Sequence, residues 1–133
     1  MKVRIYYEDT DAGGIVYHAN YIKFCERARS EMFFNSSVAP FTPNRHFVVT
    51  TMEAKFIKPA FLGDLLEIKT SIKSAKKASA ILHQEIYKVG SLNATCAPQL
   101  IFQADITVAF LVDKKLAKMD DEIVEFMKSK QEN

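Results

Sequence analysis

Apolar and polar residues alternate along most of this chain, with the two-residue period of β-strands that bury one face. The segments with this period are residues 1–8, 47–58, 65–73, 78–89 and 99–113. The last segment is the longest, and its apolar series runs from Leu100 to Val112. Its opposite face carries a second, shorter apolar set made of Ile101, Ala109 and Leu111. The pattern therefore predicts five strands.

A helical period replaces the alternation from about His18 onward. Its apolar positions are Tyr21, Phe24, Cys25, Ala28 and Met32, and the apolar face widens at Phe33 and Phe34. The polar triplet 35–37 is expected to end this helix. A short second helix is predicted after Asp120 and Asp121, which can cap it, and it carries Ile123, Val124, Phe126 and Met127.

Glycine, proline and short polar residues mark the predicted connections. Residues 9–14 are rich in Asp and Gly and predict a loop between the first strand and the long helix. Residues 38–46, which include Pro40, predict an irregular connection after that helix. Pro59 is expected to end the second strand, and residues 61–64 to form a turn before the third.

The predicted order is one strand, one long helix, four strands and a short helix. Neighbouring strands of this kind pair antiparallel, and one apolar helix against one twisted sheet is an α+β arrangement. We expect a single domain over residues 1–133, with a mainly antiparallel five-stranded sheet wrapped around the long helix. One helix cannot cover both faces of the sheet, so the mixed second face favours an oligomer.

Composition and charge are ordinary for a globular domain, with 48% hydrophobic and 26% charged residues. A formal net charge of +2 is too small to indicate nucleic acid or an anionic membrane as a partner. Cys25 and Cys96 lack metal-ligand spacing, and two such thiols fit a reducing cytosol better than a disulfide. No signal-peptide pattern and no membrane-length apolar run are present, which predicts a cytoplasmic protein.

The segment from Tyr7 to Tyr21 carries most of the chemical information. It places the carboxylate of Asp11 and two adjacent glycines just before a helix whose first N–H groups lack helical partners. A carboxylate beside a helix N-terminus is suited to attack a carbonyl and to hold the oxyanion that results. Asp11 is therefore the first candidate and Asp9 the second, although a loop Asp is by itself more often a turn cap.

Three further side chains of this segment have both a functional and a structural interpretation. His18 is a candidate base or orienting group, although a lone histidine is more often structural. Tyr7 and Tyr17 can donate hydroxyl groups, but tyrosines at strand and loop ends are common. The sequence contains no HExxH, Walker, Rossmann or GxSxG motif, so it predicts neither a metal site, nor a nucleotide cofactor, nor a serine hydrolase.

Two motifs resemble those of the hotdog-fold acyl-CoA thioesterases, and most closely the YbgC-type branch related to the hydroxybenzoyl-CoA thioesterases. The first is Tyr7-x-x-x-Asp11-x-x-Gly14-x-Val16-Tyr17-His18-x-Asn20-Tyr21, followed by Phe24, Glu26 and Arg29. The second is Ala54-x-Phe56-x-x-Pro59-Ala60-x-x-Gly63-Asp64-x-Leu66-x-Ile68. Together they span roughly the first half of the chain, and the predicted strand order of the remainder agrees with the fold.

The resemblance implies hydrolysis of an acyl-CoA thioester without a cofactor. It implies that Asp11 is the catalytic carboxylate, that the backbone N–H near His18 is the oxyanion donor, and that Tyr7 and His18 belong to the site. Substrate contacts are expected at Gly14, Val16 and Tyr17 and, near the mouth of the site, at Pro59, Phe61 and Gly63. The resemblance also implies a homotetramer, a dimer of dimers, with the active site at the dimer interface.

Several alternatives remain open at the level of sequence. Asp11 can act as a nucleophile or as a general base toward water. The acyl group can be aliphatic or aromatic. A hotdog-fold hydroxyacyl dehydratase is one competing function, and a non-catalytic subunit is another. Proteins of the YbgC-type branch are linked with acyl carrier protein and the Tol–Pal envelope system, so such partners are also considered.

Overall fold

The computed structural model describes residues 1–39 and 41–131, so Pro40 and the last two residues of the predicted domain lie outside the described part. The chain begins with strand β1 (Lys2–Arg4), the short 3-10 helix η1 (Tyr7–Asp9) and helix α1 (His18–Phe34). Strands β2 (Arg45–Phe56), β3 (Leu65–Ala75), β4 (Ser79–Gly90) and β5 (Thr95–Val112) follow. The described part ends with the short strand β6 (Lys115–Leu116) and helix α2 (Asp121–Ser129).

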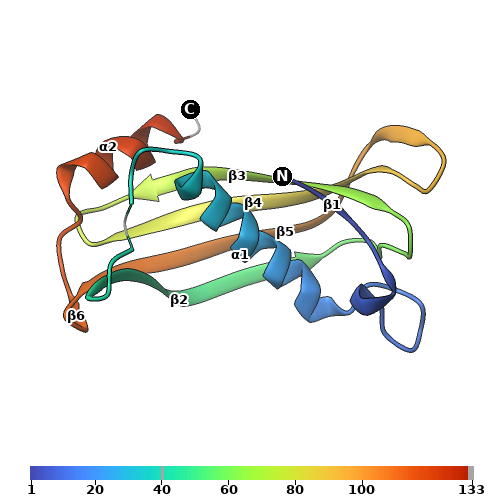
Figure 1. The fold of residues 1–133 in the computed structure, drawn as a ribbon, viewed down its shortest axis with the longest axis horizontal. Helices are drawn as coiled ribbons and strands as arrows, with labels where there is room; N and C mark the ends of the chain where they lie inside the picture. Colours follow the sequence, from blue (N-terminus) through green and yellow to red (C-terminus); the bar gives the residue numbers. More distant parts are fainter. Residues whose placement is uncertain (40, 132–133) are drawn as a thin grey trace.

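The strands form one antiparallel sheet in the order β1-β3-β4-β5-β2, and α1 crosses one of its faces diagonally (Figure 1). Strand β6, which the alternation did not predict, pairs with the end of β5. It takes the side of β5 that lies beyond the start of β4, because the β4–β5 ladder begins at the pair of Ser79 with Ala109. The predicted α+β arrangement, with a curled antiparallel sheet and one long helix, is confirmed.

Helix α1 has the predicted boundaries and buries the predicted face. Tyr21, Phe24, Cys25 and Ala28 are buried, and Met32 packs partly exposed against the same core. Phe34 is the exception, since 67% of it is exposed. Burial raises the pKa of the Cys25 thiol to about 12, whereas Cys96 is exposed at the start of β5.

The first strand is shorter than the alternation predicted. It ends at Arg4, and Tyr7, Glu8 and Asp9 form η1 in place of continuing the strand. The cause is local, because the Asp9 carboxylate accepts a hydrogen bond from the Tyr6 backbone N–H at 2.9 Å. Such side-chain-to-backbone bonds give the chain an alternative to the sheet ladder.

Ile101 does not lie on the second face of the sheet, as the alternation predicted, because it is only 1% exposed. The β4–β5 register pairs Ile86 with Phe102 and Tyr87 with Leu100, so Ile101 is the extra residue of a β-bulge. Its carbonyl oxygen accepts hydrogen bonds from the backbone N–H groups of residues 57 and 58, at 2.9 and 3.1 Å. The bulge thus anchors the chain that leaves β2.

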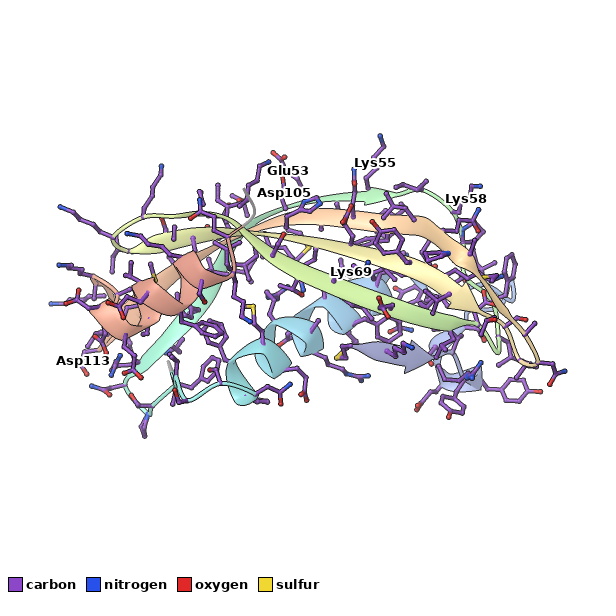
Figure 2. All side chains as sticks on the ribbon, turned by 90° about the horizontal axis from the view of Figure 1, so that it is seen from above. Glu53, Lys55, Lys58, Lys69, Asp105 and Asp113 are labelled. Atoms are coloured by element: carbon purple, nitrogen blue, oxygen red, sulfur yellow. The ribbon has the colours of Figure 1, made fainter. Side chains whose placement is uncertain are left out.

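The face of the sheet opposite α1 is polar along its middle. Asp105 accepts hydrogen bonds from Lys73 and pairs with the His83 ring, each at 2.7 Å. Glu85 lies 3.6 Å from the other ring nitrogen of His83. Figure 2 shows Asp105 and its neighbour Glu53 on this side of the sheet. Ala109 and Leu111 also lie on this face and stay partly exposed, as predicted.

This network shifts the pKa values of its members. Burial works to lower the pKa of His83, but the hydrogen bond and charge of Asp105, together with Glu85, raise it above its ordinary value. The hydrogen bond from Lys73 is the main cause that lowers the pKa of Asp105, with a further contribution from His83. Both shifts favour the charged pair in the folded state.

We predict that His83→Gln removes a pH-dependent part of the stability. The contribution of His83 is complete below its ordinary pKa of about 6.5 and disappears as pH rises through the raised folded-state pKa. Urea unfolding should show a loss of up to about 1 kcal/mol near pH 6 and a smaller loss near pH 9, as for other partly exposed ion pairs. His46→Gln, on the same face, is the control. An equal loss for His83→Gln at both pH values would contradict the assignment.

Candidate active site

Residues 10–16 form a tight loop between η1 and α1. Thr10 and Val16 form an antiparallel bridge, and the Asp11 backbone N–H donates to the Ile15 carbonyl at 2.9 Å. Gly14 has a φ of +82°, a conformation that costs any L side chain about 1–2 kcal/mol. The loop therefore holds Asp11 at a fixed place just before the helix.

The Asp11 side chain is exposed, and one of its oxygens is held by the loop itself. Its Oδ1 accepts a hydrogen bond from the Gly13 backbone N–H at 2.8 Å. A Cβ at position 13 would come within 3.2 Å of that oxygen, so a glycine keeps the approach open. The turn-capping role that the sequence allowed is thus present. Among the described residues no hydrogen bond engages Oδ2, which leaves it free for chemistry.

The start of α1 is fixed by its neighbours rather than by a capping side chain. The Tyr17 backbone N–H and the Asn20 side-chain amide both donate to the Asp9 carbonyl, each at 2.9 Å. Tyr17, the N-cap residue, makes no side-chain cap bond. Within the described part, no hydrogen bond uses the His18 N–H. The helix therefore presents an unpaired donor at its positive end, which is what an oxyanion requires.

The turn after β2 lies against this loop, as the second motif implied. Ile15 and Phe61 form an antiparallel bridge, and the Val16 N–H donates to the Ala60 carbonyl at 2.9 Å. The Ala60 N–H donates in turn to the buried Tyr21 hydroxyl at 3.0 Å. Phe61 is half-exposed beside the loop and Pro59 is exposed. These contacts bring the two motifs together in space.

The remaining predicted site residues lie in different surroundings. Val16 is buried in the core, and Gly63, with a φ of +87°, faces the Leu92 side chain of the β4–β5 hairpin. Tyr7 is 82% exposed, and only its carbonyl has a bonded partner among the described residues, at Thr10. A single chain therefore does not bring the Tyr7 hydroxyl to Asp11.

The His18 ring is exposed and packs against aromatic rings rather than against the carboxylate. Its centroid lies 4.6 Å from that of Tyr17 and 6.2 Å from that of Phe56, which it meets edge-on. Sequence reasoning placed Phe56 in the second motif and among the residues that could line an apolar acyl tunnel, but it did not predict the contact with His18. It also treated Tyr21 as a core residue, although a tyrosine at a buried helix position needs a partner for its hydroxyl. That requirement was the signal that could have found the Tyr21–Ala60 contact.

A curled antiparallel sheet around one long helix is the architecture of the hotdog class of proteins. A sequence model of the thioesterase superfamily matches residues 13–94. An acyl-CoA thioesterase, YbgC, of Helicobacter pylori strain 26695 is 46% identical over 114 residues, which cover 84% of each chain. The chain belongs to the thioesterase superfamily, and the resemblance seen in its motifs is confirmed.

Solved structures agree with this assignment. A probable thioesterase from Bartonella henselae shares 31% identity and a TM-score of 0.75, covering 90% of this chain and 96% of that one. A 4-hydroxybenzoyl-CoA thioesterase mutant complexed with 4-hydroxybenzoyl-CoA has a TM-score of 0.84 over 96% of each chain. Its identity is only 21%, so this second likeness shows the fold alone.

Within the described residues, no helix combines the length and apolar character needed to cross a membrane.

We predict that Tyr21→Phe destabilises the protein, because the buried Ala60 N–H loses its acceptor. An unsatisfied buried donor costs about 1–3 kcal/mol. Urea denaturation monitored by circular dichroism measures the loss. Tyr17→Phe is a matched control, since its ring is exposed at the helix start, and its stability should stay within about 0.5 kcal/mol of the parent. A Tyr21→Phe protein as stable as the control would show that this hydrogen bond does not anchor the helix.

Proposed function

We propose that this protein hydrolyses acyl-CoA thioesters to a carboxylic acid and free CoA. The observation that carries the proposal is the juxtaposition of the Asp11 loop with the unpaired N–H at the start of α1. The contacts of Tyr17 with Asp9 and of Val16 with Ala60 hold the two in register. The identity of 46% to a relative named as an acyl-CoA thioesterase supports the same reaction. CoA esters as substrates agree with the cytoplasmic location expected from the sequence.

The helix start is the electrophilic half of the proposed site. The His18 N–H polarises the thioester carbonyl and stabilises the negative charge that develops on its oxygen. A fixed donor is effective because it needs no reorganisation during the reaction, and losing one such donor typically costs about 10²–10³-fold in rate. The rings of Tyr17 and Phe56 lie beside His18 and are each about half-exposed, so they offer apolar surface to a substrate at this end of the site.

Asp11 is the nucleophilic half of the proposed site. In one route its free carboxylate oxygen attacks the thioester carbon, expels the CoA thiolate and leaves an anhydride that water then hydrolyses. In the other route Asp11 takes a proton from a water molecule that attacks the same carbon. The thiolate is a good leaving group, so neither route needs a strong general acid. In the proposed site His18 orients Asp11 or the water, or assists the departure of the thiolate.

Heavy-oxygen water separates the two routes in a single-turnover experiment. Label that enters the Asp11 carboxylate supports the anhydride route. Label that appears only in the product acid supports direct attack by water.

We propose that the active unit is a dimer, assembled in pairs as a homotetramer. Strand β2 is an edge of the sheet, because within the described part its ladder partner is β5. Free edges invite pairing with another chain. The exposed Tyr7 and half-exposed Phe61 flank the loop, and apolar surface of this kind is typical of an interface. A second copy at this edge would enclose the Asp11 loop, and light scattering in solution tests the assembly.

We predict that Asp11→Asn keeps the fold and loses about 10²-fold or more of turnover, as expected for a positioned acid–base group. The measurement is release of free thiol from an acyl-CoA series, followed with Ellman's reagent. Glu8→Gln is the matched control, because Glu8 is an exposed carboxylate of the neighbouring η1 turn. A folded Asp11→Asn protein with a near-normal rate would overturn the assignment of Asp11.

We predict that Tyr7→Phe lowers turnover less than Asp11→Asn does. Among the described residues no hydrogen bond joins the Tyr7 hydroxyl to the Asp11 loop, so we expect it to act through substrate or a second copy. The same thiol-release assay measures both variants. A greater loss in Tyr7→Phe would mean that the tyrosine, and not the aspartate, is the principal group of the site.

A further inference from the structure

A separate cavity lies between the second half of α1, the first half of β2 and the middle of the sheet. Its volume is about 150 Å³. Most of its lining is apolar and includes Phe33, Phe41, Phe47, Val49, Leu82 and Val108. A cavity of this volume with such a lining accepts a hydrocarbon about the size of benzene. None of the residues that form the Asp11 loop borders it.

The cavity and the proposed reaction centre lie at different points along α1. Arg29 borders it, and His18 begins the same helix. At about 1.5 Å of rise per residue, the two positions are roughly 16 Å apart along the axis of α1. An aromatic acyl group, whose ring is bonded directly to the thioester carbonyl, is too short to reach from one to the other.

An apolar stripe of β2 connects the two places. We define the stripe as the β2 residues that pair with buried residues of β5, namely Phe47, Val49, Met52, Ala54 and Phe56. At one end Phe56 meets the rings of His18 and Tyr21, with centroids 6.2 and 6.0 Å apart. At the other end Phe47 and Val49 form part of the cavity wall. Phe56 and Val49 are about half-exposed, so α1 leaves the stripe accessible.

The polar side of the cavity consists of Glu26, Arg29 and Ser30, and Arg29 among them is held by a buried partner. Arg29 donates to the Gln84 side-chain oxygen at 2.9 Å, and the Gln84 amide donates to the Cys25 carbonyl and the Thr70 hydroxyl. Burial lowers the pKa of Arg29, but the side chain stays partly exposed, which gives water access to its remaining N–H groups. The apolar wall, which makes up most of the lining and continues into the stripe, is the part suited to bind a hydrocarbon.

We propose that this cavity receives the far end of a long saturated acyl chain whose thioester lies at the Asp11 loop. The inference rests on the proposed function and specifies its substrate class. A saturated chain with C–C bonds of about 1.5 Å advances roughly 1.3 Å per carbon. Covering about 16 Å takes roughly twelve carbons. Chains of about twelve to sixteen carbons therefore reach the cavity and fill it, whereas hexanoyl and benzoyl groups do not.

Thiol release is measured for hexanoyl-, benzoyl-, dodecanoyl- and tetradecanoyl-CoA, each below the concentration at which it forms micelles. The parent should prefer tetradecanoyl- over hexanoyl-CoA in kcat/KM. Val49→Trp fills the cavity from its wall and should lower that preference by about tenfold or more, because several buried methylene groups lose their site. Thr51→Trp adds the same bulk to the opposite face of β2 and should keep the preference.

Two outcomes would overturn the proposal. One is a parent enzyme that prefers benzoyl- or hexanoyl-CoA, and the other is a Val49→Trp protein with an unaltered chain preference. Light scattering checks that Val49→Trp keeps the assembly of the parent. Phe41→Ala gives an independent test in the opposite direction, since it enlarges the cavity and should move the preference to longer chains. An unmoved preference there would also count against the cavity.

Binding separates this inference from the proposed function. Titration calorimetry with the Asp11→Asn protein compares hexanoyl-CoA with tetradecanoyl-CoA in the absence of turnover. Tighter binding of the longer chain, reduced by adding Val49→Trp, would support the cavity even if no thioester were hydrolysed. Equal affinity for both chains would overturn the cavity even if hydrolysis were confirmed.

Discussion

The site depends on the backbone of one small residue. Ala60 is fully buried, and both of its backbone polar groups serve the start of α1: its carbonyl accepts from Val16 and its N–H donates to Tyr21. A buried backbone group without a partner is costly, so these two bonds fix the helix against the turn that follows β2. The Asp11 loop is tied to the same place through Ile15 and Phe61. The Asp11 carboxylate and the first N–H groups of α1, which come from separate elements, are thus held close to one another.

The sheet supports this arrangement, and its two faces differ in character, one apolar and one charged. One face packs its apolar residues against α1, and Gln84 is a buried polar exception that is fully hydrogen-bonded to the helix and to β3. The other face carries the Lys73–Asp105–His83 network, whose charges remain near water. Strand β2 belongs to this sheet and also contacts the start of α1, where Phe56 meets His18. Its apolar stripe lies at the margin of the core.

Much of this fold could be predicted from the sequence, because helix α1 and strands β2 to β5 follow their periods closely. The position of Asp11 before the helix also followed from a short motif. The errors have local causes. The extra residue of a β-bulge in β5 turned the Ile101 side chain toward the core. A hydrogen bond from the Tyr6 N–H to the Asp9 carboxylate ended the first strand early. The contact between Tyr21 and Ala60 joins positions 39 residues apart, and no period within one element encodes such a pairing.

The order of strands in the sheet also sets an order of folding. Strands β3, β4 and β5 form a meander in which each pairs with its neighbour in sequence, so only short loops must close. Strand β2 instead pairs with β5 across the whole meander, as the register from Phe56 to Phe102 shows. Non-local pairing of this kind is slow to form. Strand β2, which would guide the acyl chain, thus joins the sheet after the meander, as β1 does through its distant pairing with β3. Until then the aromatic face and the open edge of β2 are exposed to other incompletely folded chains.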